Sequence, residues 1–179
     1  MGQVVTTFLA MFCVAVFVAS VVVHILSLIP GTVLPFDLAN LLHVGALLAL
    51  FGVMFHASTM RKRALRAGFT PQVVAKANEL QLPRLLTMLG VVVFVYVVVN
   101  FSYFLITNDG AARIRDGKYV LIQRKMNPRE LSEAEYHELQ RQELRGMSGH
   151  WIFLSGLAVG YCLFVVPHVR ARLENVSTP

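Results

Sequence analysis

The segment from Leu85 to Ile106 contains no charged side chain and is apolar almost throughout. The hydrocarbon core of a bilayer is about 30 Å thick, and roughly 20 helical residues are needed to cross it. Valine runs such as 91–93 and 97–99 would favour a strand in water. In lipid, an open strand leaves backbone N–H and C=O groups unpaired. We therefore predict that this segment is a transmembrane helix.

Three further segments have a similar length and character, so that the predicted spans are residues 4–29, 38–58, 85–106 and 148–169. The 179-residue chain is 56% hydrophobic, against about 45–50% in soluble domains. We predict a single membrane domain over 1–179: an all-α integral membrane protein in the lipid bilayer, built as a four-helix transmembrane bundle with a small extramembrane hairpin-plus-helix loop. Cys13 and Cys162 fall inside spans, where we expect packing residues rather than a disulfide.

The formal net charge of +6 comes from basic residues that flank the apolar segments. This placement is typical of a topology signal, so we expect no nucleic-acid partner. No Lys or Arg precedes Arg61, so the basic start of a signal peptide is missing and the first segment is predicted to be a retained span. The 60–84 loop with the C-terminal tail and the competing 108–147 loop carry eight Lys and Arg residues each. The denser basic cluster directly after the second span favours a cytoplasmic 60–84 loop, an extracytoplasmic 108–147 loop and both termini inside (N-in, C-in), in a bacterial inner (plasma) membrane.

The 60–84 loop carries the signals of a short helix. Thr70 can cap it and Pro71 suits its first turn, while Pro83 ends it. Its apolar face consists of Val73, Val74, Ala77 and Leu80. An apolar face beside a basic cluster is typical of an interfacial helix, and a connector packed on the bundle is the alternative.

The 108–147 loop also carries signals of regular structure. The Asp-Gly pair at 116–117 stands between Arg113-Ile114-Arg115 and Tyr119-Val120-Leu121, and it predicts a β-hairpin with a tight turn. Ser132 and Glu135 form a capping box, which predicts a helix from there to about Leu144. We interpret this loop either as a docking surface for a partner or as a cap over its own bundle.

Five of the six histidines lie in or at the edges of spans: His24, His43, His56, His150 and His168. An ionisable residue at such a depth is a functional hypothesis by default. The directions of the spans place His24, His43 and His150 near the extracytoplasmic face, and the other two near the cytoplasmic face.

Two layers of histidine in a four-helix bundle resemble a di-haem b-type cytochrome, in which neutral imidazoles ligate iron. The resemblance makes His43, His56, His150 and His168 candidate ligands of haem b. The first two lie 13 residues apart, which is a rise of about 20 Å but a rotation of about 140°. Histidine pairs in the cytochrome b family share one helix face, so two haems here would need different helix partners.

The histidines near the extracytoplasmic face suggest a metal site as well. His24, His43 and His150 could converge with Asp37 or Met147 on copper or another transition metal, because imidazole and thioether suit copper. The spans that carry them would have to meet, which the sequence alone does not determine.

The residues Gly146-Met147-Ser148-Gly149 resemble the GxSG motif of rhomboid intramembrane proteases. The resemblance implies that Ser148 is a nucleophile with His24 or His43 as its base. The alternative is structural: Gly146 ends the loop helix, and Ser148 caps the fourth span.

No phosphate loop, dinucleotide fingerprint or paired carboxylates occur in the sequence, so we do not expect a stand-alone enzyme of soluble substrates. Our first hypothesis is that the protein is an accessory or structural subunit of a larger, energy-transducing membrane complex. It would contact other subunits through the Gly156/Gly160 face and the 108–147 loop. The second is a quinone-linked electron-transfer module with b-type haem, and the third is the copper or transition-metal site.

Overall fold

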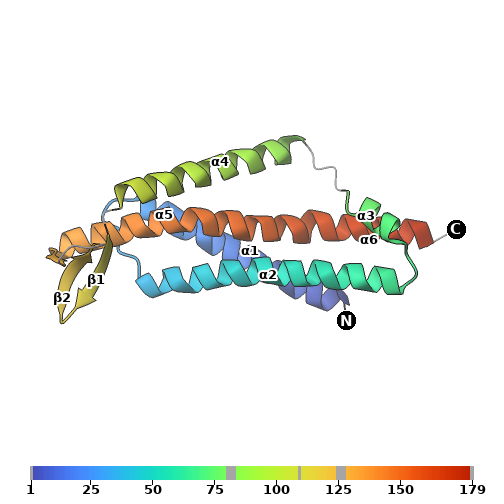
Figure 1. The fold of residues 1–179 in the computed structure, drawn as a ribbon, viewed down its shortest axis with the longest axis horizontal. Helices are drawn as coiled ribbons and strands as arrows, with labels where there is room; N and C mark the ends of the chain where they lie inside the picture. Colours follow the sequence, from blue (N-terminus) through green and yellow to red (C-terminus); the bar gives the residue numbers. More distant parts are fainter. Residues whose placement is uncertain (1, 80–83, 109, 124–127, 178–179) are drawn as a thin grey trace. The chain divides into compact units, whose positions relative to one another are not determined.

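Four helices of the computed structural model are long and apolar enough to cross a membrane (Figure 1). The structure describes residues 2–79, 84–108, 110–123 and 128–177. The protein is 80% helical, as predicted for an all-α membrane bundle. The four candidate spans are Gln3–Leu28, Asp37–Arg66, Leu86–Thr107 and Glu133–Val176, and each contains most of one predicted span.

The elements follow one another as α1 (Gly2–Leu28), α2 (Phe36–Arg66), α3 (Pro71–Ala77), α4 (Arg84–Thr107), β1 (Ala111–Arg115), β2 (Lys118–Ile122), β3 (Arg129–Glu130), α5 (Glu133–Gly160), a π-helical turn (Tyr161–Val165) and α6 (Val166–Ser177). The chain divides into two units, and α1, α2, α4 and α5 each contribute to both. The first unit comprises Met1–Phe17, Gly45–Val91 and Leu154–Pro179. The second comprises Val18–Val44 and Val92–Phe153.

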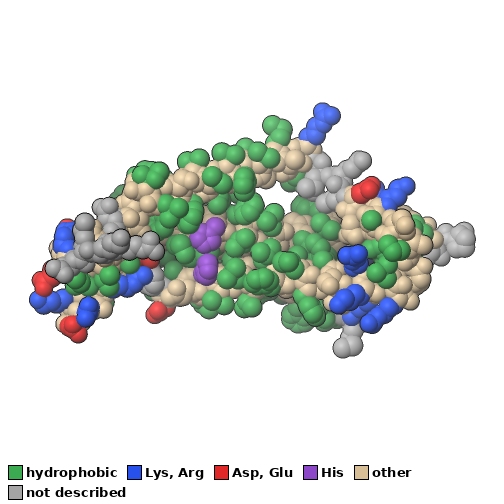
Figure 2. All heavy atoms as spheres, viewed as in Figure 1, with side chains coloured by type: hydrophobic (Ala, Val, Ile, Leu, Met, Phe, Trp, Pro, Cys, Tyr) green, Lys and Arg blue, Asp and Glu red, His purple; other side chains and the backbone are tan. Residues whose placement is uncertain are grey.

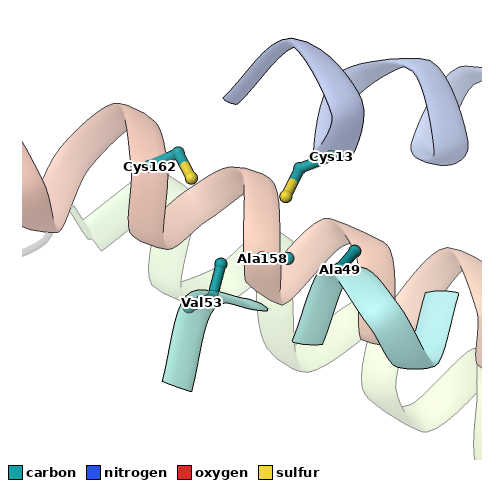
Figure 3. Close-up of a cluster of buried hydrophobic side chains, with 5 residues drawn as sticks. All are labelled: Cys13, Ala49, Val53, Ala158 and Cys162. Atoms are coloured by element: carbon teal, nitrogen blue, oxygen red, sulfur yellow. The ribbon is translucent and has the colours of Figure 1, made fainter. Parts of the chain in front are cut away.

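Small side chains from four elements form the core of the first unit. Cys13 of α1, Ala49 and Val53 of α2, Ala158 of α5 and Cys162 of the π-helical turn make up this cluster (Figure 3). Both cysteines are free and buried, in agreement with the predicted packing role. Cores of small residues allow helix backbones to approach closely in a membrane.

Glycines of α2 and α5 bring their helices close to α1. A Cβ added to Gly52 would lie 3.1 Å from Leu9 Cδ1, and one added to Gly156 would lie 3.3 Å from Phe17 Cε2. Around the Cβ position of Gly160, no atom of the described residues lies within 4 Å. Gly156 therefore serves packing inside the first unit, while Gly160 leaves open space.

The last helical segment changes its winding just before a proline. The backbone N–H of Val166 donates to the Tyr161 carbonyl, five residues back, and residues Tyr161–Val165 form a π-helical turn. Pro167 has no N–H, and its ring would clash with the carbonyl four residues earlier in a regular α-helix. The wider turn removes that conflict, and the helix continues as α6.

In the second unit, α4 lies close against α5 at two glycines of α5. A Cβ on Gly146 would lie 2.7 Å from Phe104 Cβ, and one on Gly149 would lie 3.0 Å from Asn100 Nδ2. The prediction that Gly146 ends a helix was wrong, because α5 runs unbroken from Glu133 to Gly160. The glycine is needed for the contact with Phe104, and a single glycine inside a helix costs only about 1 kcal/mol.

The predicted β-hairpin is confirmed. Strands β1 and β2 pair antiparallel with Arg115 opposite Lys118, and both turn residues have positive φ, 53° at Asp116 and 76° at Gly117, as a type I′ turn requires. A short third strand, β3, was not predicted, and it pairs with β2. The Glu130 carboxylate on β3 hydrogen-bonds the Lys118 ammonium and raises its pKa above the usual range.

The capping box that begins α5 is also confirmed. The Ser132 backbone N–H donates to Glu135 Oε2 over 2.8 Å, and the Glu135 N–H donates to Ser132 Oγ over 3.2 Å. A small core below the sheet joins it to this helix start and consists of Ala112, Leu121, Leu131 and Tyr136. The described residues of the 108–147 segment therefore form a folded module with a core of its own.

The short helix of the 60–84 segment begins as predicted. Thr70 Oγ1 accepts the Val73 N–H over 3.3 Å, and Pro71 is the first helical residue. Val74 and Ala77 are buried, and Arg172 of α6 donates to the Lys76 carbonyl over 2.7 Å. The helix ends at Ala77. Leu80 and Pro83, which were predicted to complete it, lie outside the described residues.

Charged side chains gather at the ends of the long helices. Figure 2 shows Lys and Arg around the hairpin in the second unit and around α3 and α6 in the first, while hydrophobic side chains cover the helices. The most apolar stretch of α4 is only 6% buried, against 28% in each of the other three candidate spans. This distribution is that of helices surrounded by lipid.

Candidate functional site

A buried histidine links three helices of the second unit. His24 of α1 is 6% exposed. Its Nδ1 lies 2.8 Å from Ser148 Oγ of α5, and its Nε2 lies 2.5 Å from the Tyr96 hydroxyl of α4. Both ring nitrogens therefore have partners, as a buried polar group requires.

The partners of Ser148 decide the proton positions in this cluster. Ser148 Oγ can donate to the Arg145 carbonyl over 3.2 Å, and we assign it as the acceptor of a proton on His24 Nδ1. His24 Nε2 is then the acceptor of the Tyr96 hydroxyl proton. This assignment follows from the hydrogen-bond network. It gives a donor and an acceptor to each contact among Tyr96, His24 and Ser148.

The same arrangement does not suit a serine nucleophile. A base must carry a free lone pair towards the hydroxyl that it activates, whereas His24 Nδ1 carries a proton towards Ser148. Ser148 is also fully buried, in the interior of α5 and not at a helix start. The histidine and serine that the rhomboid resemblance paired do lie together, and their geometry is that of a structural link between helices.

A second histidine group lies on α2 and α5. The Trp151 indole Nε1–H donates to His43 Nδ1 over 3.0 Å. The rings of His43 and His150 lie edge to face, with centroids 5.6 Å apart. Trp151 is 1% exposed and so holds the His43 ring in a defined orientation.

A cavity of about 220 Å³ lies beside His43 and is lined by Ala39, Asn40, His43, Arg113, Glu143, Leu144, Met147 and Trp151. Polar groups come from α2, from the hairpin and from α5, while Leu144, Met147 and Ala39 supply apolar wall. A concave apolar site with a few convergent polar groups is the usual form of a small-ligand site.

An ion pair forms one side of this cavity. Arg113 Nη1 lies 3.3 Å from Glu143 Oε2, and Nη2 lies 3.5 Å from Oε1. Arg113 Nη1 also donates to the Ala112 carbonyl over 2.8 Å. The Arg113 and Glu143 side chains are 41% and 19% exposed. The charges of the pair cancel, so the cavity has polar donors without a net positive charge.

The two remaining candidate haem ligands lie in the first unit. His56 Nε2 is 3.0 Å from Thr6 Oγ1, and its Nδ1 is 3.1 Å from the Tyr161 hydroxyl. His168 Nε2 is buried and has no hydrogen-bond partner among the described residues. Of the pair, only His168 thus keeps a ring nitrogen without a partner.

The structure groups the predicted histidines in a specific way. His43 and His150 meet ring to ring, whereas two imidazoles on one haem iron lie on opposite faces of a porphyrin. His24 belongs to the separate cluster with Ser148. Across the described part of the chain, no three His, Cys, Asp or Glu side chains are close enough to hold a metal ion together.

Six of the eight residues that line the cavity were not anticipated as site residues, among them Arg113, Glu143 and Trp151. Arg113 lies on the hairpin and Glu143 on α5, 30 positions apart. A basic and an acidic residue so far apart carry no sequence signal of a shared site. The Trp151–His43 contact depends on the rotation of two helices, which hydropathy does not define.

No protein-family model, no curated protein and no solved structure matches this chain.

Proposed function

We propose that this protein is a small membrane subunit that binds the ring of a quinone in the cavity beside His43. The observation that carries the proposal is the hydrogen bond from Trp151 to His43 Nδ1. In neutral imidazole one nitrogen accepts and the other donates. Because Nδ1 accepts, Nε2 carries the proton and is a donor for a carbonyl oxygen.

The balance of charge favours a neutral ligand over an anion. Arg113 is paired with Glu143, so a carboxylate entering the cavity would meet the Glu143 carboxylate as well as the guanidinium. Like charges at short range oppose binding. A quinone carbonyl can accept hydrogen bonds without bringing a charge.

The size and the walls of the cavity favour a single ring. Its volume of about 220 Å³ is below the ~300–1,000 Å³ of sites for drug-sized ligands. The edge of the buried Trp151 ring is part of the lining, and aromatic rings favour offset or edge contacts. Leu144 and Met147 give apolar contact to ring substituents.

The proposal extends to a larger membrane complex. Binding alone transfers no electron, so an electron donor would come from another subunit of an energy-transducing assembly. The lipid-facing surface of α4, which is the least buried of the four candidate spans, and the folded 108–147 module offer surfaces for such a partner. If the protein purified in mild detergent runs only as a monomer at every loading, this extension fails.

Intrinsic fluorescence tests the site directly, because Trp151 is the only tryptophan of the chain. Titration with a short-chain benzoquinone should quench its emission to a plateau. The variant His43→Leu removes the donor, and an affinity loss of about tenfold follows from one hydrogen bond of ~1.4 kcal/mol. The control His56→Leu changes a histidine of the other unit and should keep the wild-type dissociation constant.

Linear quenching without a plateau, or equal dissociation constants for wild type and His43→Leu, would overturn the proposal. The absorption spectrum and elemental analysis of the same preparation address the other chemistries of these histidines. A Soret band that shifts on reduction would favour haem b, and stoichiometric copper would favour the metal hypothesis.

For the topology we propose that the 60–84 segment and both termini are cytoplasmic, in a bacterial inner membrane. The basic cluster Arg61–Arg66 after the second span supports this orientation. Gln72 on α3 and Arg115 on β1 are both exposed. In a background without the native cysteines, an impermeant maleimide should label Arg115→Cys in intact cells and Gln72→Cys only after permeabilisation. The reverse pattern would invert the topology.

A further inference from the structure

We propose a second binding site, in the first unit, where Arg63 and Arg170 hold the phosphate of an anionic phospholipid. The site does not depend on the quinone proposal, because none of its residues lines the cavity beside His43. Its ligand is defined by chemistry: a phosphodiester that carries one negative charge, attached to acyl chains.

The site is a cavity of about 300 Å³ between α2 and α6, lined by His56, Met60, Arg63, Ala64, Ala67, Arg170 and Leu173. Two guanidinium groups lie on its wall, and no carboxylate is among these lining residues. Met60 and Leu173 provide apolar surface next to the charges. The lining therefore offers strong donors to an anion and an apolar contact to the chain attached to it.

Arg170 is held in place by a chain of hydrogen bonds. Its Nη2 donates to Thr6 Oγ1 over 2.8 Å. Thr6 Oγ1 lies 3.0 Å from His56 Nε2, and His56 Nδ1 lies 3.1 Å from the Tyr161 hydroxyl. The Tyr161 hydroxyl in turn lies 3.9 Å from Met60 Sδ. Groups from α1, α2 and the π-helical turn thus connect Arg170 to the cavity wall.

One set of proton positions satisfies all of these contacts. Arginine can only donate, so Thr6 Oγ1 accepts from Arg170 and gives its own proton to His56 Nε2. His56 Nδ1–H then donates to Tyr161, whose hydroxyl donates to Met60 Sδ. Thr6 takes up one arm of the guanidinium, and the planar fork keeps further N–H groups in fixed directions.

Arg63 supplies the second charge. It is exposed on α2 in the last turn of that helix, next to the other basic residues of the cluster. Arg63 and Arg170 both lie close enough to His56 to act on it electrostatically. Arginine matches the geometry of phosphate oxygens through paired N–H bonds, and two arginines at one cavity give such a group two points of attachment.

The surroundings favour a lipid over free phosphate. Basic pockets between transmembrane helices on the cytoplasmic side are a recurrent site for anionic headgroups, and the negative leaflet attracts basic segments. The walls formed by Met60, Ala64, Ala67 and Leu173 would offer nothing to inorganic phosphate. They suit the glycerol and first methylenes of a lipid.

Native mass spectrometry of the full chain, released from nanodiscs of mixed phosphatidylglycerol and phosphatidylcholine, tests the site. Wild type should retain phosphatidylglycerol in preference to phosphatidylcholine. Arg63→Gln and Arg170→Gln should each lower the retained phosphatidylglycerol by about tenfold, as expected for a charge-assisted hydrogen bond. The matched control is Arg66→Gln, which removes one charge from the same basic cluster but not from the cavity lining.

Thr6→Val adds a test that keeps both guanidinium groups. It frees Arg170 from its anchor and should lower retention by a smaller factor than Arg170→Gln, with an unchanged circular dichroism spectrum. This variant keeps the proposal testable if the arginine variants fail to fold.

Two competitors separate the possible sources of phosphate. Glycerol phosphate and inorganic phosphate at millimolar concentration should leave the lipid peaks unchanged. Displacement of the lipid by either one would overturn the assignment to a phospholipid. Equal loss in Arg66→Gln, or equal retention of the two lipids by wild type, would show general charge attraction and overturn the site itself.

Discussion

The indole N–H of Trp151 and Nδ1 of His43 form a 3.0 Å hydrogen bond that ties α5 to α2 in the second unit. The bond leaves the imidazole proton on Nε2. In ¹⁵N spectra of histidine-labelled protein at neutral pH, we expect His43 to show the Nε2-protonated tautomer. Trp151→Phe should give a mixture of tautomers. A wild-type spectrum with Nδ1 protonated would contradict this geometry and the donor role assigned to Nε2.

The close approach of α4 and α5 predicts opposite effects at two glycines. Gly146→Ala would place a Cβ 2.7 Å from Phe104 Cβ, and such overpacking costs about 1–3 kcal/mol. Gly160→Ala meets open space among the described residues and should be neutral or stabilising by up to about 1 kcal/mol. Unfolding by SDS in mixed micelles measures both. Equal effects would contradict the packing of Gly146 against Phe104.

The proton positions around His24 predict that Ser148 is structural. Ser148→Ala would leave the His24 Nδ1–H without an acceptor, and an unpaired buried donor costs about 1–3 kcal/mol. The double variant Ser148→Ala/His24→Leu should lose less stability than the sum of the losses in the two single variants, because the two side chains interact. A fluorophosphonate probe should form no adduct at Ser148, and labelling of that residue would restore the nucleophile hypothesis.

The core of the first unit predicts that its two thiols can be joined. Cys13 and Cys162 belong to one buried cluster of the first unit, and Figure 3 shows their side chains on facing sides of it. Treatment with iodine, which enters lipid, should form a disulfide, so that neither thiol reacts with a maleimide after denaturation. Cys13→Ser should leave Cys162 reactive. Full maleimide reaction of both thiols in oxidised wild type would contradict the position of Cys13 of α1 near Cys162.

Local signals in the sequence were sufficient for the elements that depend on local chemistry. The Asp116-Gly117 pair specifies a turn with two positive φ values, and Ser132 with Glu135 satisfies the first N–H groups of α5. The spans follow in the same way from length and hydropathy, because a helix in lipid needs an uninterrupted apolar segment. Each of these features involves residues close together in the chain.

The candidate sites depend on contacts that no local pattern contains. His43 and His56 both lie on α2, and their partners Trp151 and Thr6 could not be identified without helix packing. Gly146 is a further residue whose role depends on a contact with a residue distant in the sequence. Its sequence context favours a helix stop, and only the nearby Phe104 explains why a glycine stands inside α5.

The π-helical turn before Pro167 determines how the side chains of α6 are rotated around the helix axis. One extra residue in a helical turn shifts the following side chains by about 100° around the axis. If a substitution of Pro167 allowed the regular α-helix to continue, Arg170 would rotate away from Thr6 by that angle. Pro167 thus acts through the winding of the helix: it influences which way Arg170, three residues further along, points toward Thr6.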